Sequence, residues 1–209
     1  MRPGFRLAEP LPIVTDGPYS RPRHEVSIQR RAHESSPESS LIEQLIRDVP
    51  DFPKKGILFK DITPLLQSAR GLESTIAAMA EATNPATYDV VCGIESRGFI
   101  FGTALAHHLG KGFVPIRKPG KLPWKTASES YQLEYGTDRI EIHVDAVQAG
   151  QGVLMVDDLL ATGGTMEAAL KLVRRIGGNP VACSFLIELG FLDGRKRLGG
   201  IPVHALLRY

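Results

Sequence analysis

Short apolar runs alternate with polar turns from residue 39 onward. Runs rich in β-branched side chains are typical of buried strands. These runs lie at 88–94, 112–116, 153–156, 181–189 and 203–207. Helical spacing of apolar residues predicts helices over 41–49, 74–83, 99–109 and 166–176, with a short polar helix over 190–198. Strands that alternate with helices favour an α/β domain with a mostly parallel central sheet flanked by helices.

Three segments depart from this alternation. Ser40 to Glu43 has the form of a capping box, so we expect a helix to begin there and to end before Pro50. The prolines and glycine of 51–64 indicate a fixed, irregular path. Residues 124–136 lack periodicity and are long for a connection, which is typical of a lid or binding loop. Residues 139–143 alternate like the return arm of a hairpin.

Residues 1–38 differ in texture from the rest of the chain. They are rich in proline and arginine and have no sustained periodicity, so we expect a disordered extension before a domain that spans 39–209. Their acidic residues count against a transit peptide. An added tail and a gene start assigned too early both fit this segment.

Composition narrows the class of protein. A chain of 209 residues fits one domain with a full hydrophobic core. A net charge of +2 favours neither a nucleic-acid partner nor a membrane surface, and no apolar run reaches the ~18 residues that span a bilayer. Cys92 and Cys183 fall within apolar strand patterns. We therefore expect buried thiols and a cytoplasmic location.

The most informative stretch is 153–165, where a strand, two acids, a glycine turn and a helix follow one another. Ligands in open α/β sheets collect beyond the carboxyl ends of the strands, where we expect Asp157 and Asp158 to lie. Residues 161–165 are small or hydroxyl-bearing and lead into a helix N-terminus, which favours an anion. We interpret this loop as a phosphate cradle.

The two acids suggest what carries the phosphate. Carboxylates accept hydrogen bonds, and a ribose presents two neighbouring hydroxyls that donate them. A phosphate cradle beside paired acceptors therefore suits a ribose 5-phosphate. The alternative is a simple helix cap by Thr162 or Thr165, but an adjacent acidic pair is costly without a ligand or cation.

Cations follow two of the predicted strands. Arg97 lies in the turn after 88–94, where it could grip a phosphate or pyrophosphate bidentately. Arg117, Lys118 and Lys121 follow 112–116 and suggest a second anionic group on the substrate. A surface arginine in the first case and a solvated basic loop in the second remain the alternatives.

The run from Val156 to Thr165 resembles the motif with which type I phosphoribosyltransferases bind 5-phosphoribosyl 1-diphosphate (PRPP). Its sequence, Val-Asp-Asp-Leu-Leu-Ala-Thr-Gly-Gly-Thr, is similar to that of the motif in the adenine-specific branch of this family. The resemblance covers about 41–209 and includes the lid motif Leu-Glu-Tyr-Gly at 133–136. It implies a mobile β-hairpin lid, a small hood over the base site, and transfer of phosphoribose from PRPP to adenine. It also implies Mg²⁺ bound mainly through PRPP and water, and a homodimer.

The resemblance assigns roles to individual residues. The catalytic group would comprise Glu134, which handles the proton of the base, with Asp157, Asp158 and Arg97. The PRPP site would comprise Asp157, Asp158, Ala161, Thr162, Gly163, Gly164, Thr165, Arg97, Arg117, Lys118 and Lys121. The adenine site would comprise Leu58, Phe59, Lys60 and Leu159, although family members often carry Arg in place of Lys60.

Two other functions stay open at this stage. Base identity depends on a few loop contacts, so a phosphoribosyltransferase for another base is the nearer alternative. A regulator that senses PRPP, has lost catalysis and binds nucleic acid is the other. The near-neutral charge and the lack of a helix-turn-helix extension count against the regulator.

Overall fold

A computed structural model describes residues 37–132 and 136–209. The chain divides into two units, Met1–Glu34 and Ser35–Tyr209, and everything described belongs to the second. The predicted extension lies outside the described residues except for 37 and 38, which begin a helix. Glu134 and its neighbours in the lid motif also lie outside them.

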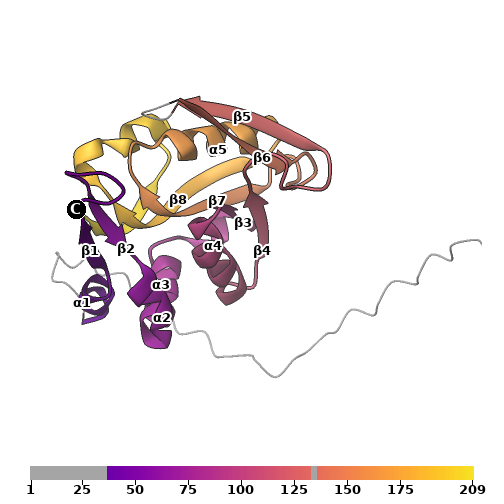
Figure 1. Cartoon of the computed structure of the whole chain (residues 1–209). Helices are drawn as coiled ribbons and strands as arrows, with labels where there is room; N and C mark the ends of the chain where they lie inside the picture. The colour runs from indigo at the N-terminus through magenta and orange to yellow at the C-terminus, as the bar shows by residue number, and fades with distance from the viewer. Residues whose placement is uncertain (1–36, 133–135) are drawn as a thin grey trace, which may run out of the picture. The chain divides into compact units, whose positions relative to one another are not determined.

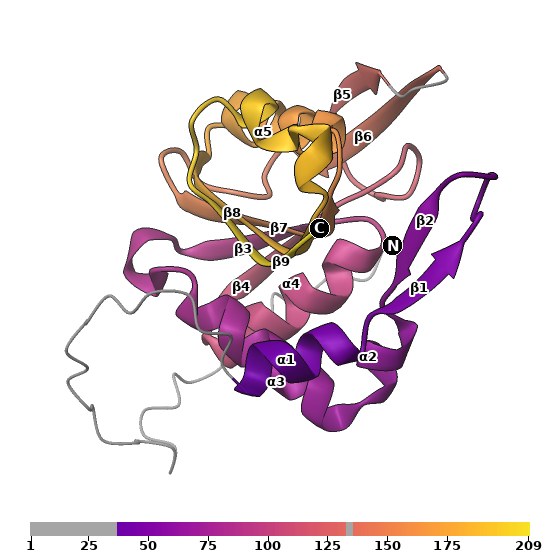
Figure 2. The same ribbon diagram turned by 90° about the vertical axis from the view of Figure 1, so that its left-hand side faces the viewer.

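A five-stranded parallel sheet forms the centre of this unit, with the strand order β4-β3-β7-β8-β9 (Figure 1). The strands are β3 (Val90–Ile94), β4 (Gly112–Ile116), β7 (Gly152–Leu160), β8 (Asn179–Glu188) and β9 (Val203–Arg208). All of them match the apolar runs, which confirms the α/β prediction. Figure 2 shows helices on both faces of the sheet.

The two faces of the sheet bury different halves of each strand. On β7, Val153 and Met155 pack with α5 (Gly164–Arg175), whereas Leu154 and Val156 pack with the helices on the other face. Those helices are α1 (Pro37–Gln44), α2 (Thr63–Gln67), α3 (Ala69–Glu81) and α4 (Arg97–His108). Burial on both sides explains why the strands read as continuous apolar runs rather than as alternating ones.

Helix α5 follows its predicted pattern closely. Its residues Met166, Ala169, Leu170 and Val173 are all at most 2% exposed and form one face against the sheet. Glu167 in the first turn and basic residues in the last turn complement the helix dipole. After β8 the chain forms short 3₁₀ turns at η2 (Gly190–Leu192) and η3 (Gly194–Leu198), where a polar helix was predicted. A third such turn, η1 (Pro85–Thr87), precedes β3.

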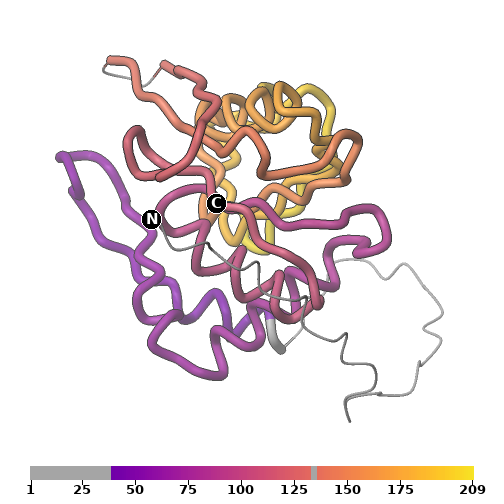
Figure 3. Tube along the Cα trace, turned by 90° about the vertical axis from the view of Figure 1, so that its right-hand side faces the viewer, coloured from indigo at the N-terminus to yellow at the C-terminus, as the bar shows by residue number. Residues whose placement is uncertain are grey.

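Two antiparallel hairpins complete the unit. The first joins β1 (Arg47–Pro50) to β2 (Leu58–Asp61), and the second joins β5 (Thr126–Gln132) to β6 (Thr137–His143). Figures 2 and 3 show both hairpins extending from the same side of the unit. The second hairpin confirms the predicted return arm. Among the described residues, no helix is long and apolar enough to cross a membrane.

Several boundaries differ from the sequence predictions, and α3 begins at Ala69 rather than at 74. Helix α1 covers 37–44 rather than 41–49, so Ser40 lies inside the helix, where its Oγ accepts a hydrogen bond of 3.2 Å from Gln44 Nε2. The following residues instead pair with β2, which also gives regular structure to part of the stretch expected to be irregular. Strand β7 continues through the acids to Leu160, because that end of the strand still pairs with β8.

Candidate functional site

The two acids of β7 meet the start of α4. Asp158 is 7% exposed, and its Oδ2 lies 2.7 Å from Nε of Arg97, the first residue of that helix. Asp157 is partly buried, and its Oδ1 accepts a hydrogen bond of 2.9 Å from the Asp158 amide. The structure therefore brings together three residues that the sequence analysis selected from two separate motifs.

Gly98 makes this close approach possible. A Cβ at Gly98 would lie 2.8 Å from the Val156 carbonyl oxygen and 2.9 Å from Oδ1 of Asp157. Both distances are well inside van der Waals contact, so a larger residue would push α4 away from β7. Arg97 could be selected from the sequence as a residue of this turn, but the close packing of its neighbour Gly98 becomes visible only in the fold.

The environment of the two acids disfavours their charged forms. Burial and the neighbouring Asp158 charge raise the pKa of Asp157 well above its ordinary range. Burial also raises the pKa of Asp158, and the Arg97 guanidinium opposes that rise. Two carboxylates thus lie close to one cation. A ligand that supplied hydroxyl groups or positive charge would stabilise their charged forms.

The glycine loop forms a small cavity beside Asp157. Its volume is about 80 Å³, and residues 157 and 159–166 line it. The N-cap of α5 is Gly163, in a left-handed conformation with φ 82°, and among the described residues no side chain caps this helix. The alternative that Thr162 or Thr165 serves as a cap is therefore wrong. Among the described residues the first N–H groups of α5 therefore receive no hydrogen bond from an N-cap side chain, which is compatible with an anion site.

Two of the three cations after β4, Arg117 and Lys118, pair with carboxylates that no sequence motif identified. Arg117 contacts Glu95 through Nε at 3.1 Å and Nη2 at 3.2 Å, and the Lys118 amide donates to Glu95 Oε2 at 3.0 Å. The hydrogen bond from Arg117 lowers the pKa of Glu95. Lys121 is exposed, and its carbonyl accepts a hydrogen bond from Arg117 Nη1 at 3.1 Å.

Lys118 connects this loop to the β5–β6 hairpin. Its ammonium bonds the Asp138 carboxylate and lies 3.1 Å from the Tyr131 hydroxyl. Burial opposes the charge, but these hydrogen bonds outweigh it and raise the pKa of Lys118. The predicted basic loop is therefore not simply solvated: two of its three cations are oriented by specific acids.

The β1–β2 hairpin carries three of the predicted base-site residues, Leu58, Phe59 and Lys60, and places Phe59 beside Arg97. The Phe59 ring lies 5.7 Å from the Arg97 guanidinium and packs edge-on against Phe52. Leu58 is 51% exposed, as an open apolar contact surface would be. The Lys60 ammonium instead bonds Asp48 at 2.7 Å and lies 3.7 Å above the Tyr209 ring. The Lys60 side chain thus holds the hairpin in place through these two contacts.

Leu159 directly follows the two acids on β7. It is partly buried and packs against the core cluster that contains α1 to α4. Among the described residues, no group of three His, Cys, Asp or Glu side chains could hold a metal ion.

Comparisons with known proteins agree with this geometry. A family model described as "Phosphoribosyl transferase domain" matches residues 60–197. An adenine phosphoribosyltransferase of Thermotoga neapolitana is 54% identical over 168 residues, which cover 80% of this chain and 99% of that protein. An adenine phosphoribosyltransferase crystal structure from Thermoanaerobacter pseudethanolicus matches with a TM-score of 0.80 and 53% identity, covering 82% of this chain and 99% of that one.

A structure with ligands extends the comparison. The adenine phosphoribosyltransferase of Saccharomyces cerevisiae was crystallised with adenine and an imino-altritol 1,6-bisphosphate. It matches this chain with a TM-score of 0.78 and 40% identity, covering 81% of this chain and 98% of that one.

Proposed function

Because the chain belongs to the phosphoribosyl transferase domain family, we propose that it transfers the phosphoribosyl group of PRPP to adenine, giving AMP and diphosphate. This is a reaction of purine salvage. The observation that carries the proposal is the uncapped N-terminus of α5 directly beside the strained carboxylates of β7. One part suits a 5-phosphate, and the other suits the hydroxyls and the developing positive charge of the ribose.

The 5-phosphate occupies the loop formed by Ala161, Thr162, Gly163, Gly164 and Thr165. Backbone N–H groups and the threonine hydroxyls donate to its oxygens, and the dipole of α5 favours its negative charge. Because the loop is closed behind by packed backbone, the phosphate fixes the ribose in one place. That fixed position brings the anomeric carbon within reach of both the base and the departing group.

Asp157 and Asp158 act on the sugar. In the reaction the bond from C1 of ribose to diphosphate breaks, a bond from C1 to a ring nitrogen of adenine forms, and that nitrogen loses its proton. The transition state is oxocarbenium-like, as in glycoside chemistry. Carboxylates that are already desolvated stabilise such a cation without having to reorganise. Glu134 is the group we propose for accepting the proton of the base.

Arg97, Arg117, Lys118 and Lys121 receive the diphosphate. Arg97 is 43% exposed despite its ion pair, so part of its guanidinium is open to a ligand. The carboxylates that hold Arg117 and Lys118 reduce the entropy these side chains would lose on binding. A Mg²⁺ ion bound through the diphosphate and water would neutralise part of the charge on the leaving group.

Leu58, Phe59, Lys60 and Leu159 form the adenine site. Leu58 and the Phe59 ring offer apolar surface beside Arg97, while Lys60 contributes through its place in β2 because its ammonium is engaged by Asp48. The small number of polar groups in this region makes the choice of base sensitive to hairpin position. A phosphoribosyltransferase for another base is therefore the alternative that most needs testing.

We further propose a homodimer in the cytoplasm. A shallow apolar groove between α3 and α4, which includes Ile100 at 40% exposure, supports self-association better than α1, where Ile42 is buried in the core. The reduced and buried Cys92 and Cys183 suit a reducing compartment. Light scattering at several protein concentrations would show a mass of two chains if the dimer forms.

A panel of bases tests the function. The full chain is supplied with PRPP and Mg²⁺ together with adenine, hypoxanthine, guanine, xanthine or orotate, and diphosphate release is followed. We expect adenine to exceed every other base by at least about 100-fold in kcat/KM, since the site's few polar contacts discriminate strongly when left unpaired. A stronger rate with another base would reassign the substrate, and no release with any base would favour the regulator.

A further inference from the structure

The phosphate loop is supported from behind by a segment that no motif identified. Gly194 opens the turn η3, and a Cβ on it would overlap the carbonyl oxygen of Ala161. In the other direction, a Cβ on Gly163 would lie 2.5 Å from the Gly194 carbonyl oxygen. Both contacts involve backbone atoms, so rotation of a side chain cannot relieve either of them.

Gly194 is required by space rather than by backbone conformation. Its φ does not lie in the left-handed region, whereas Gly163 has a φ of 82° there. Alanine would therefore suit the conformation at 194 but would collide with the loop. The Leu160 side chain lies 3.0 Å from the same Cβ position, so an added methyl group could not shift in that direction either.

The segment around Gly194 is itself rigidly held. Arg195 forms a two-point ion pair with Glu188, through Nε at 2.7 Å and Nη2 at 2.6 Å, and its Nη1 donates to the Val203 carbonyl at 2.9 Å. The Glu188 side chain is only 3% exposed. These contacts tie the turn to the ends of β8 and β9, so it cannot retreat easily when pushed.

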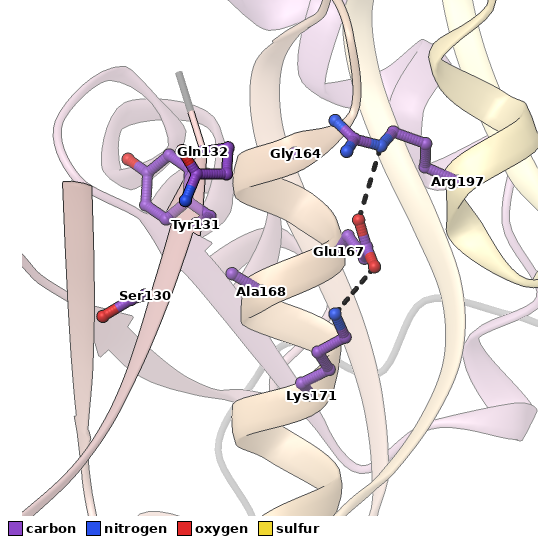
Figure 4. A pocket seen from close by; sticks show the side chains of 8 residues that line it. All are labelled: Ser130, Tyr131, Gln132, Gly164, Glu167, Ala168, Lys171 and Arg197. Carbon is purple, nitrogen blue, oxygen red and sulfur yellow. Dashed lines mark hydrogen bonds and ion pairs between the residues drawn. The ribbon is translucent and has the colours of Figure 1, made fainter. Parts of the chain in front are cut away.

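A second tie leads from the same turn to α5. Arg197 Nε lies 3.5 Å from Glu167 Oε2, and Lys171 donates to the other oxygen of Glu167 at 2.7 Å. Figure 4 shows this chain of charges along a cavity of about 200 Å³ that reaches Gly164 at the helix start. Arg197 thereby fixes the first turn of α5 relative to η3.

From these contacts we propose that residues 194–197 position the 5-phosphate loop, with Gly194 as the positioning residue for PRPP. The proposal rests on the proposed function of that loop. A loop that binds phosphate through N–H groups needs those groups aimed to within about 0.5 Å. In the described part of the chain Gly163 is the N-cap of α5, and no side chain caps this helix. The N–H groups are therefore oriented by the packing of the loop backbone against Gly194.

The direct test is Gly194→Ala. The added methyl displaces the Ala161 carbonyl, so we expect the KM for PRPP to rise at least tenfold while the KM for adenine stays within twofold. The matched control is Gly112→Ala, where the new Cβ would meet only Val90 Cγ2 at an ordinary 3.6 Å. A folded Gly194→Ala protein with an unchanged KM for PRPP would overturn the proposal, as would an equal rise in both KM values.

A second variant adds no volume and so keeps the test open if Gly194→Ala does not fold. Arg197→Met removes the tie to Glu167, and we expect the KM for PRPP to rise two- to fourfold with no change for adenine. Lys196→Ala is its control, because Lys196 is exposed and bonds only Asp193 among the described residues. An Arg197→Met protein that matches Lys196→Ala in both KM values would contradict the proposal.

Calorimetric titration with ribose 5-phosphate separates this inference from the proposed reaction. Wild-type binding that weakens in Gly194→Ala and not in Gly112→Ala supports the positioning role even if turnover fails for another reason. Equal affinity in all three proteins would count against the role, whatever the enzyme assay shows.

Discussion

Asp157→Asn should make the free protein more stable while making it a poor enzyme. Asparagine has the shape of the aspartate, and its Oδ1 can still accept the hydrogen bond from the Asp158 amide. The substitution removes one of two negative charges that lie in a partly buried site. If the acids exist to receive a ligand, the apo chain carries them at a cost, and removing one charge should reveal that cost.

The size of the effect follows from simple electrostatics. Two unit charges about 4–6 Å apart repel by about 3–4 kcal/mol at an effective dielectric constant of about 20. The Arg97 guanidinium near both acids offsets part of this repulsion, so we expect a net gain of about 1–2 kcal/mol in the free energy of unfolding. For a chain of this size the gain corresponds to a rise in Tm of about 2–8 °C.

The pH dependence gives the prediction a sign. Because the pKa of Asp157 is raised from its ordinary value of 3.8, the folded chain binds more protons than the unfolded chain between that value and the raised one. The free energy of unfolding of the wild type therefore falls as the pH rises through this window. Asparagine does not titrate, so the advantage of the variant should be largest near pH 7 and should fade as the pH falls toward 3.8.

Thermal unfolding at several pH values and steady-state kinetics at pH 7 make the test. Turnover should fall by about 10²–10³-fold, because a preorganised charge at the developing cation is lost. Asp158→Asn is the comparison: it breaks the 2.7 Å ion pair with Arg97, so it should be stabilised less or not at all. A lower Tm for Asp157→Asn at pH 7, or a gain that persists in acid, would refute the reasoning.

Three further predictions use other parts of the site. Gly98→Ala should lower the free energy of unfolding by about 1–3 kcal/mol in a calorimeter, since its Cβ would lie within 3.0 Å of β7; an unchanged Tm would mean that the helix is not closely packed there. Asp138→Asn should raise the KM for PRPP a few-fold with little change in Tm, because it frees the partly exposed Lys118; a large loss of Tm would make the pair structural instead. Glu134→Ala should lower kcat more than it raises the KM for PRPP, and an unchanged kcat would remove it as the base.

The parts of the fold predicted well from sequence are those with dense local patterns. Helix α5 presents its apolar residues at helical spacing, and strand β3 is a short, β-branched apolar run bounded by polar turns. The β1–β2 hairpin was missed because neither strand has a buried residue and the two are joined by pairs such as Arg47 with Asp61, which a local pattern does not contain. Strand pairing between exposed segments depends on tertiary context.

The site divides in the same way. The phosphate loop and both acids are contiguous, so their chemistry could be read along the chain. The acids that hold the cations could not be read, because Glu95 lies 22 residues from Arg117, and Asp138 lies 20 residues from Lys118. Gly194 left no signal at all, since it opens a short polar turn and matters only through backbone atoms brought beside it by the fold.

The most direct measurement of the central claim is a phosphorus NMR time course of PRPP, Mg²⁺ and adenine with the protein. Signals of AMP and diphosphate should grow in equal amounts as the PRPP signals decline, and omission of adenine should stop AMP formation. A spectrum that does not change, or loss of PRPP without AMP, would contradict the account.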